Sequence, residues 1–394
     1  MTASSAVVES FDQWLRTDFR ELNTQLEQAY YAARLEIVCD RPNLEELKKT
    51  LLLDGAELTR RIADDGRLPS DARGRYELLG MVGYHLGACR RHEIDRSEVA
   101  STGALAAAWS IANRLGSSLG VAPRYVFAHQ ALYNLAVRDT YRTFTSLPDE
   151  RAFINNNGLA VLAYQRAANA LRRIPPMGVS NPMAGYLFED ARAALDDVLR
   201  FNQTLSRTVE VDRFFFNIRP YFKPYRVGSV EYRGANAGDF AAVNEIDLLL
   251  GLCQAQDPFY QTLLAEKYAY VPPEDQTLLR AAVDSGSLLE TFLHEAATGG
   301  VTPHLRRNAQ LFLGVCHAHG AAYAFHHHKL VKPFLERPAK TAPQERLDGI
   351  TASGPPLEAV IGMLETLRDL RTARDRPGRV SARGSLERLR RIAS

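Results

Sequence analysis

The stretch NLEELKKTLLLDGAELTRRIADDG, residues 43–66, decides the fold class. Its leucines recur at steps of three and four residues, at Leu44, Leu47, Leu51 and Leu52. That spacing places them on one face of an α-helix, and the closing glycine is a typical helix end. The stretch therefore predicts one long amphipathic helix with a buried leucine face.

The same helical periodicity returns along most of the chain. It is clearest in GALAAAWSIANRLG (103–116), AALDDVLRFNQTLSRTVEV (193–211) and DFAAVNEIDLLLGLC (239–253). We find no run of alternating strands and no G-x-G-x-x-G motif. The sequence predicts an all-α protein.

Length and composition exclude several classes of protein. The chain has 394 residues, of which 46% are hydrophobic and 24% charged, with a net charge of +2. These values fit one large globular domain or two modest ones, and they do not indicate a nucleic-acid or membrane partner. No apolar run approaches the roughly 20 residues that span a bilayer, and the N-terminus lacks a signal peptide, so we expect a cytoplasmic protein. The four cysteines are scattered, which disfavours a zinc cage, an iron–sulfur cluster and covalently attached haem.

Proline, glycine and charge divide the chain into three predicted parts. Residues 1–75 are predicted to form an N-terminal helical segment, 76–345 the main helical domain, and 346–394 a polar connection with a basic helix or tail. Within the second part, 172–185 reads as a loop and 221–238 as a longer irregular segment of functional character. For the arginine-rich C-terminus we weighed an RNA contact against a solvated tail or terminal helix, and favour the latter.

Three consecutive histidines stand in AYAFHHHKLVKPFL, residues 322–335. On a helix they point about 100° apart, so only one can face the interior. That one is His327, because it shares a face with Tyr323, Leu330 and Val331. His326 shares a wetter face with His319, His328 is intermediate, and Pro333 should kink or end the helix.

Two roles for His327 stay open from the residues alone. It is either a hydrogen-bonded core histidine or the single imidazole that a haem iron needs from its protein. In the second case Gly320 would let a flat macrocycle approach closely.

A second constellation, RFFFNIRPYFKPYRVG, places Arg219 after Phe214 and Phe215. An arginine among aromatic rings can bind a carboxylate through two parallel (bidentate) hydrogen bonds. The alternative is an arginine paired with a core carboxylate, such as Asp212 or Glu245.

The small residues of GANAG, 234–238, follow this constellation and would let backbone lie against a flat ligand. They could equally form a tight turn before the next helix. Asp239 looks like the N-cap of that helix.

Together these segments resemble the haem-dependent superfamily of tryptophan and indoleamine 2,3-dioxygenases, and within it the monodechloroaminopyrrolnitrin synthase family. The resemblance rests on YHLGACRRHEIDRSEV, RTFTSLPDERAF, FFFNIRPYFKPYRVG and HHKLV, which occur in the family's order. It extends from about Gly80 to Phe334, and the first 70 or so residues match nothing. The implied fold is the dioxygenase-type helical bundle enclosing a b-type haem.

The resemblance implies roles for individual residues. His327 corresponds to the proximal ligand of the haem iron, with Gly234, Tyr323 and Val331 as further cofactor-binding residues. Arg219, with Phe214 and Phe215, corresponds to the site of the substrate carboxylate. The catalytic residues implied are His129, Asn236, Ala237 and Gly238 on the distal side.

Asn236 replaces the hydroxyl residue of the dioxygenases, which predicts against simple ring cleavage to N-formylkynurenine. The implied function is attack on an aromatic ring by oxygen bound to ferrous haem. The substrates would be O2 and tryptophan or a related, modified aromatic amino acid, in secondary metabolism. The alternatives are an oxygenase of another amino acid, a haem-binding sensor without turnover, and a helical interaction protein without cofactor. The oligomeric state stays open.

Overall fold

The structure is a computed structural model that describes residues 6–39, 41–96, 103–336 and 356–394. Helices account for most of it, and the prediction of an all-α protein is confirmed. The long helix predicted from residues 43–66 is α3 (Pro42–Asp65), and Gly66 ends it in the left-handed conformation, with φ 68°. Most of the polar connection predicted for residues 335–356 lies outside the described residues.

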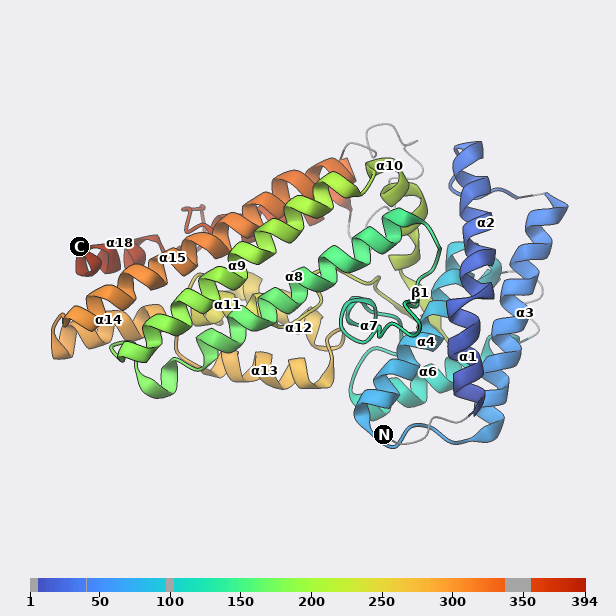
Figure 1. Cartoon of the computed structure of the whole chain (residues 1–394), viewed down its shortest axis with the longest axis horizontal. Coiled ribbons are helices and arrows are strands. Elements are labelled where there is room, and N and C mark those ends of the chain that lie inside the picture. The colour runs from blue at the N-terminus through green and yellow to red at the C-terminus, as the bar shows by residue number, and fades with distance from the viewer. Residues whose placement is uncertain (1–5, 40, 97–102, 337–355) are drawn as a thin grey trace. The chain divides into compact units, whose positions relative to one another are not determined.

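The chain folds as two units (Figure 1). Unit 1 comprises Met1–Asn155, Thr208–Asp239 and Phe334–Leu357, and unit 2 comprises Asn156–Arg207, Phe240–Pro333 and Glu358–Ser394. The long helix α8 (Pro148–Arg172) runs through a boundary between them. Each unit is described below by itself.

Unit 1 is built around α4. Its elements are α1 (Ala6–Arg16), α2 (Asp18–Ala33), α3, α4 (Ala72–Arg91), η1 (Ile94–Arg96), α6 (Ala106–Leu119), α7 (Phe127–Ala131), α10 (Val211–Arg213), η3 (Phe214–Ile218), η4 (Arg219–Phe222), β1 (Tyr225–Val227) and β2 (Val230–Tyr232). Helix α4 is buried along nearly its whole length and contacts α1, α3, α6, α7, η4 and β1. The N-terminal helices are therefore an integral part of this unit.

Glycines on α4 allow its neighbours to come close. A Cβ at Gly83 would lie 2.5 Å from the backbone nitrogen of Tyr125, so only glycine fits there. An aromatic core then fills the rest of the unit, with the Phe144 ring stacked on Tyr221 at 4.2 Å and tilted against Tyr84 at 4.8 Å.

The irregular segment predicted for 221–238 contains a short antiparallel hairpin. Tyr225 pairs with Tyr232 and Val227 with Val230, and Gly228 adopts a positive φ of 64° at its turn. The sequence showed no alternating run here because each strand is only three residues long.

Unit 2 holds the rest of α8 together with η2 (Pro175–Met177), α9 (Pro182–Thr208), α11 (Ala242–Leu249), α12 (Pro258–Tyr268), α13 (Pro273–Asp284), α14 (Leu288–Gly299), α15 (Pro303–His326), η5 (His327–Glu336), α17 (Leu357–Arg371) and α18 (Arg383–Ala393). Helices α8, α9 and α15 lie side by side in Figure 1. Contacts agree with this view, since Arg166 bonds to Asp190 and the Phe188 ring meets Phe312 at 5.8 Å. The C-terminal arginine-rich stretch forms helix α18, which packs on α14 and α15.

None of the helices in the described ranges is long and apolar enough to cross a membrane.

Candidate functional site

His327 stands where α15 changes into the π-helix η5. It is fully buried, with no exposed area, while His328 is exposed and His326 is partly buried. The prediction that His327 alone of the three faces the interior is confirmed. Pro333 lies inside η5, and its missing N–H and its bulk oppose a regular α-helix at this point.

Among the residues that the structure describes, neither ring nitrogen of His327 has a hydrogen-bond partner. The Glu365 carboxylate lies close by, with Oε1 at 3.8 Å from Nε2. Burial, aided by Arg368, His328 and Lys332, lowers the pKa of His327 to about 4, so the ring is neutral at pH 7. A buried imidazole that lacks partners is costly, and a neutral imidazole is the form that ligates iron. The residue therefore fits the role of haem ligand.

Tyr323 and Val331 are both buried, one helical turn before and after His327. The Tyr323 ring lies under the guanidinium of Arg371, at 4.1 Å from the ring centroid. Gly320 does not serve the predicted close approach of a macrocycle. A Cβ there would lie 2.9 Å from the carbonyl oxygen of Arg371, so this glycine lets α17 pack on α15.

A buried polar network behind this helix was not evident from the sequence. Asp247 on α11 accepts hydrogen bonds from His319 Nε2 at 2.7 Å, from Arg371 Nε at 2.8 Å and from the Tyr260 hydroxyl at 2.7 Å. Arg371 and His319 hold the pKa of the Asp247 carboxyl well below its usual range despite burial. His319, which the sequence placed on a more solvent-exposed face, is fully buried, and its Nε2 is bonded to this carboxylate. The sequence did not reveal these contacts, because Asp247 is far from His319 and Arg371 along the chain.

In unit 1, Arg219 is buried with 6% of its surface exposed, and its guanidinium lies 4.3 Å from the Phe215 ring centroid. Its Nε and Nη1 atoms have no hydrogen-bond partner in the described ranges. Burial lowers its pKa to about 10, so it stays charged at pH 7. The alternative of a core ion pair is wrong, because Asp212 is exposed and Glu245 pairs with Arg172.

The charges around Arg219 compensate it only in part. Arg91 is paired with Glu27 at 2.7 Å, and Lys223 is paired with Glu36, which also attracts Arg219 from further away. Three cations thus share two carboxylates, which leaves one excess positive charge in this cluster. A single bound carboxylate would balance this cluster.

The two phenylalanines before Arg219 have different surroundings. Phe215 lies against the guanidinium, whereas Phe214 packs on Phe153 at 4.9 Å and on Phe334 at 5.5 Å. The structure therefore brings Phe215 and Arg219 together and places Phe214 in a separate aromatic cluster.

The loop from Gly234 to Gly238 has a defined shape. Arg233 donates two hydrogen bonds of 2.9 Å to the Asp239 carboxylate, which also accepts from the Asn236 backbone N–H at 2.9 Å. Gly234 is buried, and Asn236 and Ala237 are partly buried. Gly238 is exposed, and a Cβ at this position would meet no other atom within 4 Å.

Asp239 is not the helix N-cap that the sequence predicted. Its carboxylate closes the loop instead, and α11 begins only at Ala242. The carboxylate that accepts from the Ala241 backbone N–H, at 3.0 Å, belongs to Asp275.

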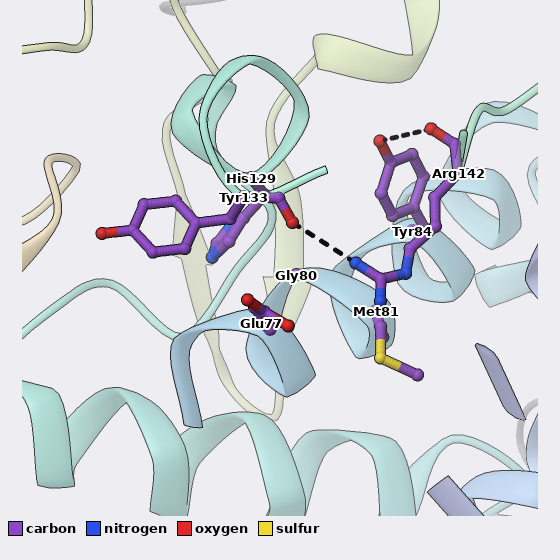
Figure 2. Close-up of a pocket in the computed structure, with 7 residues that line it drawn as sticks. All are labelled: Glu77, Gly80, Met81, Tyr84, His129, Tyr133 and Arg142. Atoms are coloured by element: carbon purple, nitrogen blue, oxygen red, sulfur yellow. Dashed lines mark hydrogen bonds between the residues drawn. The ribbon is translucent and has the colours of Figure 1, made fainter. Parts of the chain in front are cut away.

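His129 lies on the short helix α7 and lines a narrow pocket in unit 1 (Figure 2). The other lining residues are Glu77, Gly80, Met81, Tyr84, Tyr133 and Arg142. A Cβ at Gly80 would lie 2.8 Å from the imidazole, so glycine makes room for the ring. Figure 2 also shows the hydrogen bonds that connect Arg142 with Tyr84 and with Tyr133.

The protonation state of His129 follows from its contacts. Burial, with Arg124 and Arg142 nearby, lowers its pKa to about 3, so the ring is neutral. Nδ1 accepts a hydrogen bond from the Val126 backbone N–H at 3.0 Å, which puts the single proton on Nε2. Nε2 has no partner. His129 therefore offers one buried hydrogen-bond donor.

The candidate residues form two groups. Unit 1 carries Arg219, Phe215, His129 and the loop at 234–238, and unit 2 carries Tyr323, His327 and Val331 up to Pro333. Unpaired polar atoms of buried side chains occur in both groups, at Arg219, His129 and His327.

A family model described as Monodechloroaminopyrrolnitrin synthase PrnB matches residues 5–393. The match covers nearly the whole chain, whereas the sequence resemblance spanned only Gly80 to Phe334. The first 70 residues, which the sequence alone could not place, therefore belong to the matched region, in agreement with the packing of α1, α2 and α3 in unit 1.

Proposed function

This chain belongs to the monodechloroaminopyrrolnitrin synthase family, and from that premise we propose that it is a haem b oxygenase of an aromatic amino acid. The family consists of haem-dependent, oxygen-using oxidoreductases of secondary metabolism, and its reaction involves ring rearrangement. An interaction protein without cofactor and a sensor without turnover both disagree with that membership.

His327 is the residue that we propose as the ligand of the haem iron, with Tyr323 and Val331 beside it on the same helix. Its complete burial and its two unpartnered nitrogens support this role. When bound, haem supplies the reduced iron that activates O2.

Arg219 is the observation that carries the proposal of an amino-acid substrate. Its buried, only partly compensated charge suits one carboxylate, and the Phe215 face keeps water from the guanidinium. Its role would be to bind and orient the substrate through the carboxylate, which leaves the aromatic ring free to react. We also consider an amino acid other than tryptophan, because a carboxylate site alone does not select the side chain.

We propose His129 and the loop residues Asn236, Ala237 and Gly238 as catalytic residues, with Gly234 at the loop's start. The Nε2–H group of His129 would donate a hydrogen bond to the substrate or to an oxygen atom. Asn236 offers both a donor and an acceptor. We propose that this loop directs the reaction away from simple ring cleavage.

The test is to incubate the reduced holoenzyme with tryptophan under labelled oxygen and analyse the products by mass spectrometry. We expect the Soret band to shift on adding tryptophan and the product to be something other than doubly labelled N-formylkynurenine. Two labelled atoms in a ring-opened product would make this a plain dioxygenase. No shift with tryptophan, but one with another aromatic amino acid, would select the second candidate.

A further inference from the structure

The carbonyl group of Phe216, in the π-helix η3, cannot accept the hydrogen bond of a regular α-helix. The residue four positions later is Pro220, which has no backbone N–H to donate. Arg91 on α4 donates a hydrogen bond to this carbonyl, with its Nη2 at 3.1 Å from the Phe216 oxygen. A side chain from a distant helix thus completes this turn.

Asn217, the next residue, is held from α2. Its Nδ2 donates to Glu27 Oε2 at 2.8 Å and to the Glu27 backbone oxygen at 3.1 Å, and its side chain is fully buried. The same Glu27 carboxylate receives Arg91 Nε at 2.7 Å and Nη2 at 2.9 Å. Both charged side chains are at most 1% exposed, so the pair is well shielded from water.

These contacts fix Phe216 and Asn217, which lie three and two positions before Arg219. The Arg219 backbone N–H in turn donates to the Phe214 carbonyl, five residues back, which is the hydrogen bond of a π-helix. The shape of the turn therefore sets the direction of the Arg219 side chain. The same network occupies Glu27 fully, so that this carboxylate is not available to Arg219.

We propose that Arg91 and Asn217 are positioning residues that hold η3 so that Arg219 is aimed at, and kept free for, a carboxylate ligand. The inference rests on the proposed function for the identity of that ligand. It adds that helices α2 and α4, far from Arg219 in sequence, determine how well the site recognises an anion. Neither residue touches the ligand in this proposal.

The test compares indole-3-propionate with its neutral amide as ligands of the holoenzyme, by calorimetry. We expect wild type to prefer the acid, and Arg219→Ala to remove the preference. Asn217→Ala changes no charge, and Arg91→Lys keeps the charge but loses the bidentate hydrogen bonds to the Glu27 carboxylate. Each should lower the preference for the acid by about tenfold, with the affinity for the amide and the haem content unchanged. Asn113→Ala and Arg90→Lys, on exposed or half-buried positions, are the matched controls.

The outcomes separate the two proposals. If Arg219→Ala removes the preference while Asn217→Ala and Arg91→Lys keep it, the positioning roles are wrong and the carboxylate site stands. If acid and amide weaken equally in the positioning variants, those residues only support the fold, which also contradicts the inference. If Arg219→Ala keeps the preference, the carboxylate site itself is wrong. Should Arg91→Lys not fold, Asn217→Ala and Asn217→Ser decide the question.

Discussion

At the scale of single residues, the most informative observation is which polar atoms are buried without a partner. Helical periodicity was sufficient to select His327 from three adjacent histidines, because the apolar residues on its face are close in sequence. It could not show that both ring nitrogens lack partners, since that depends on residues such as Glu365, 38 positions away by number. Likewise, the sequence left open whether Arg219 was paired, and only the packing of Glu27 and Glu36 answers it.

His327→Ala should lose haem, while His328→Ala should retain it, because only the first residue is buried with free nitrogens. The measurement is the ratio of Soret to protein absorbance after purification. His326→Ala is a second control from the partly buried neighbour. Equal haem content in all three variants would remove His327 as the ligand.

His85 is predicted to make stability fall in acid. It is fully buried, and burial lowers its pKa to about 4 in the folded protein, against roughly 6.5 when unfolded. Its neutral form therefore contributes fully above pH 6.5, and the contribution is lost as pH falls from 6.5 towards 4, at about 1.4 kcal/mol per pH unit.

Urea unfolding at pH 7 and pH 5 would measure this effect. His85→Gln should show a smaller loss of unfolding free energy between the two pH values than wild type does. The exposed His304→Gln is the control. An identical loss in wild type and His85→Gln would contradict the assignment of this pH dependence to His85.

At the scale of elements, both π-helices of the described chain fall on the segments that the sequence selected for function. Each contains or precedes a proline, Pro333 in η5 and Pro220 after η3, and this is a feature that the sequence does display. The sequence predicted a kink or an end for the helix at Pro333, whereas the backbone continues by widening its turns. At η3, the widened turn is accompanied by a long-range contact, the hydrogen bond from Arg91 to the Phe216 carbonyl, which the local sequence pattern does not display.

The loop at 234–238 should lose its shape when the pair of Arg233 and Asp239 is broken. Asp239 is 1% exposed, and removing its charge leaves Arg233 without the bidentate partner that closes the loop. Asp239→Asn should therefore speed proteolysis within 233–240 and change the ratio of products. Glu231→Gln, on the exposed edge of β2, is the control. An unchanged product ratio despite faster cleavage would show that the loop does not direct the reaction.

At the scale of the whole molecule, the N- and C-terminal parts proved to be the least predictable from sequence. Helices α1 to α3 were recognisable as helices but not as part of the family's fold, because their contacts with α4 are long-range. The arginine-rich end was predicted as a solvated tail or a terminal helix, and it does form the helix α18. Its first arginine, Arg371, also pairs with the buried Asp247 in unit 2, a contact that no periodicity reveals.

Arg371→Met should destabilise unit 2 by roughly 3–5 kcal/mol, because it leaves the Asp247 carboxylate buried without its main counter-charge. Arg374→Met, an exposed neighbour, should have little effect. Chemical unfolding monitored by circular dichroism is the measurement. A stability equal to that of Arg374→Met would show that His319 and Tyr260 satisfy Asp247 unaided.

The hydrogen-bonded span of a π-helix contains one residue more than that of an α-helix, because its bonds join residues five positions apart rather than four. A single-codon deletion between Phe214 and Arg219 could therefore be absorbed by the backbone, which would return to α-helical spacing. The side chains on either side of the deletion would then swing by about 100° relative to one another. We expect such a deletion to yield a folded, well-expressed protein in which Arg219 faces elsewhere, so insertions and deletions at η3 are a route by which this lineage could change or lose its substrate without losing its fold.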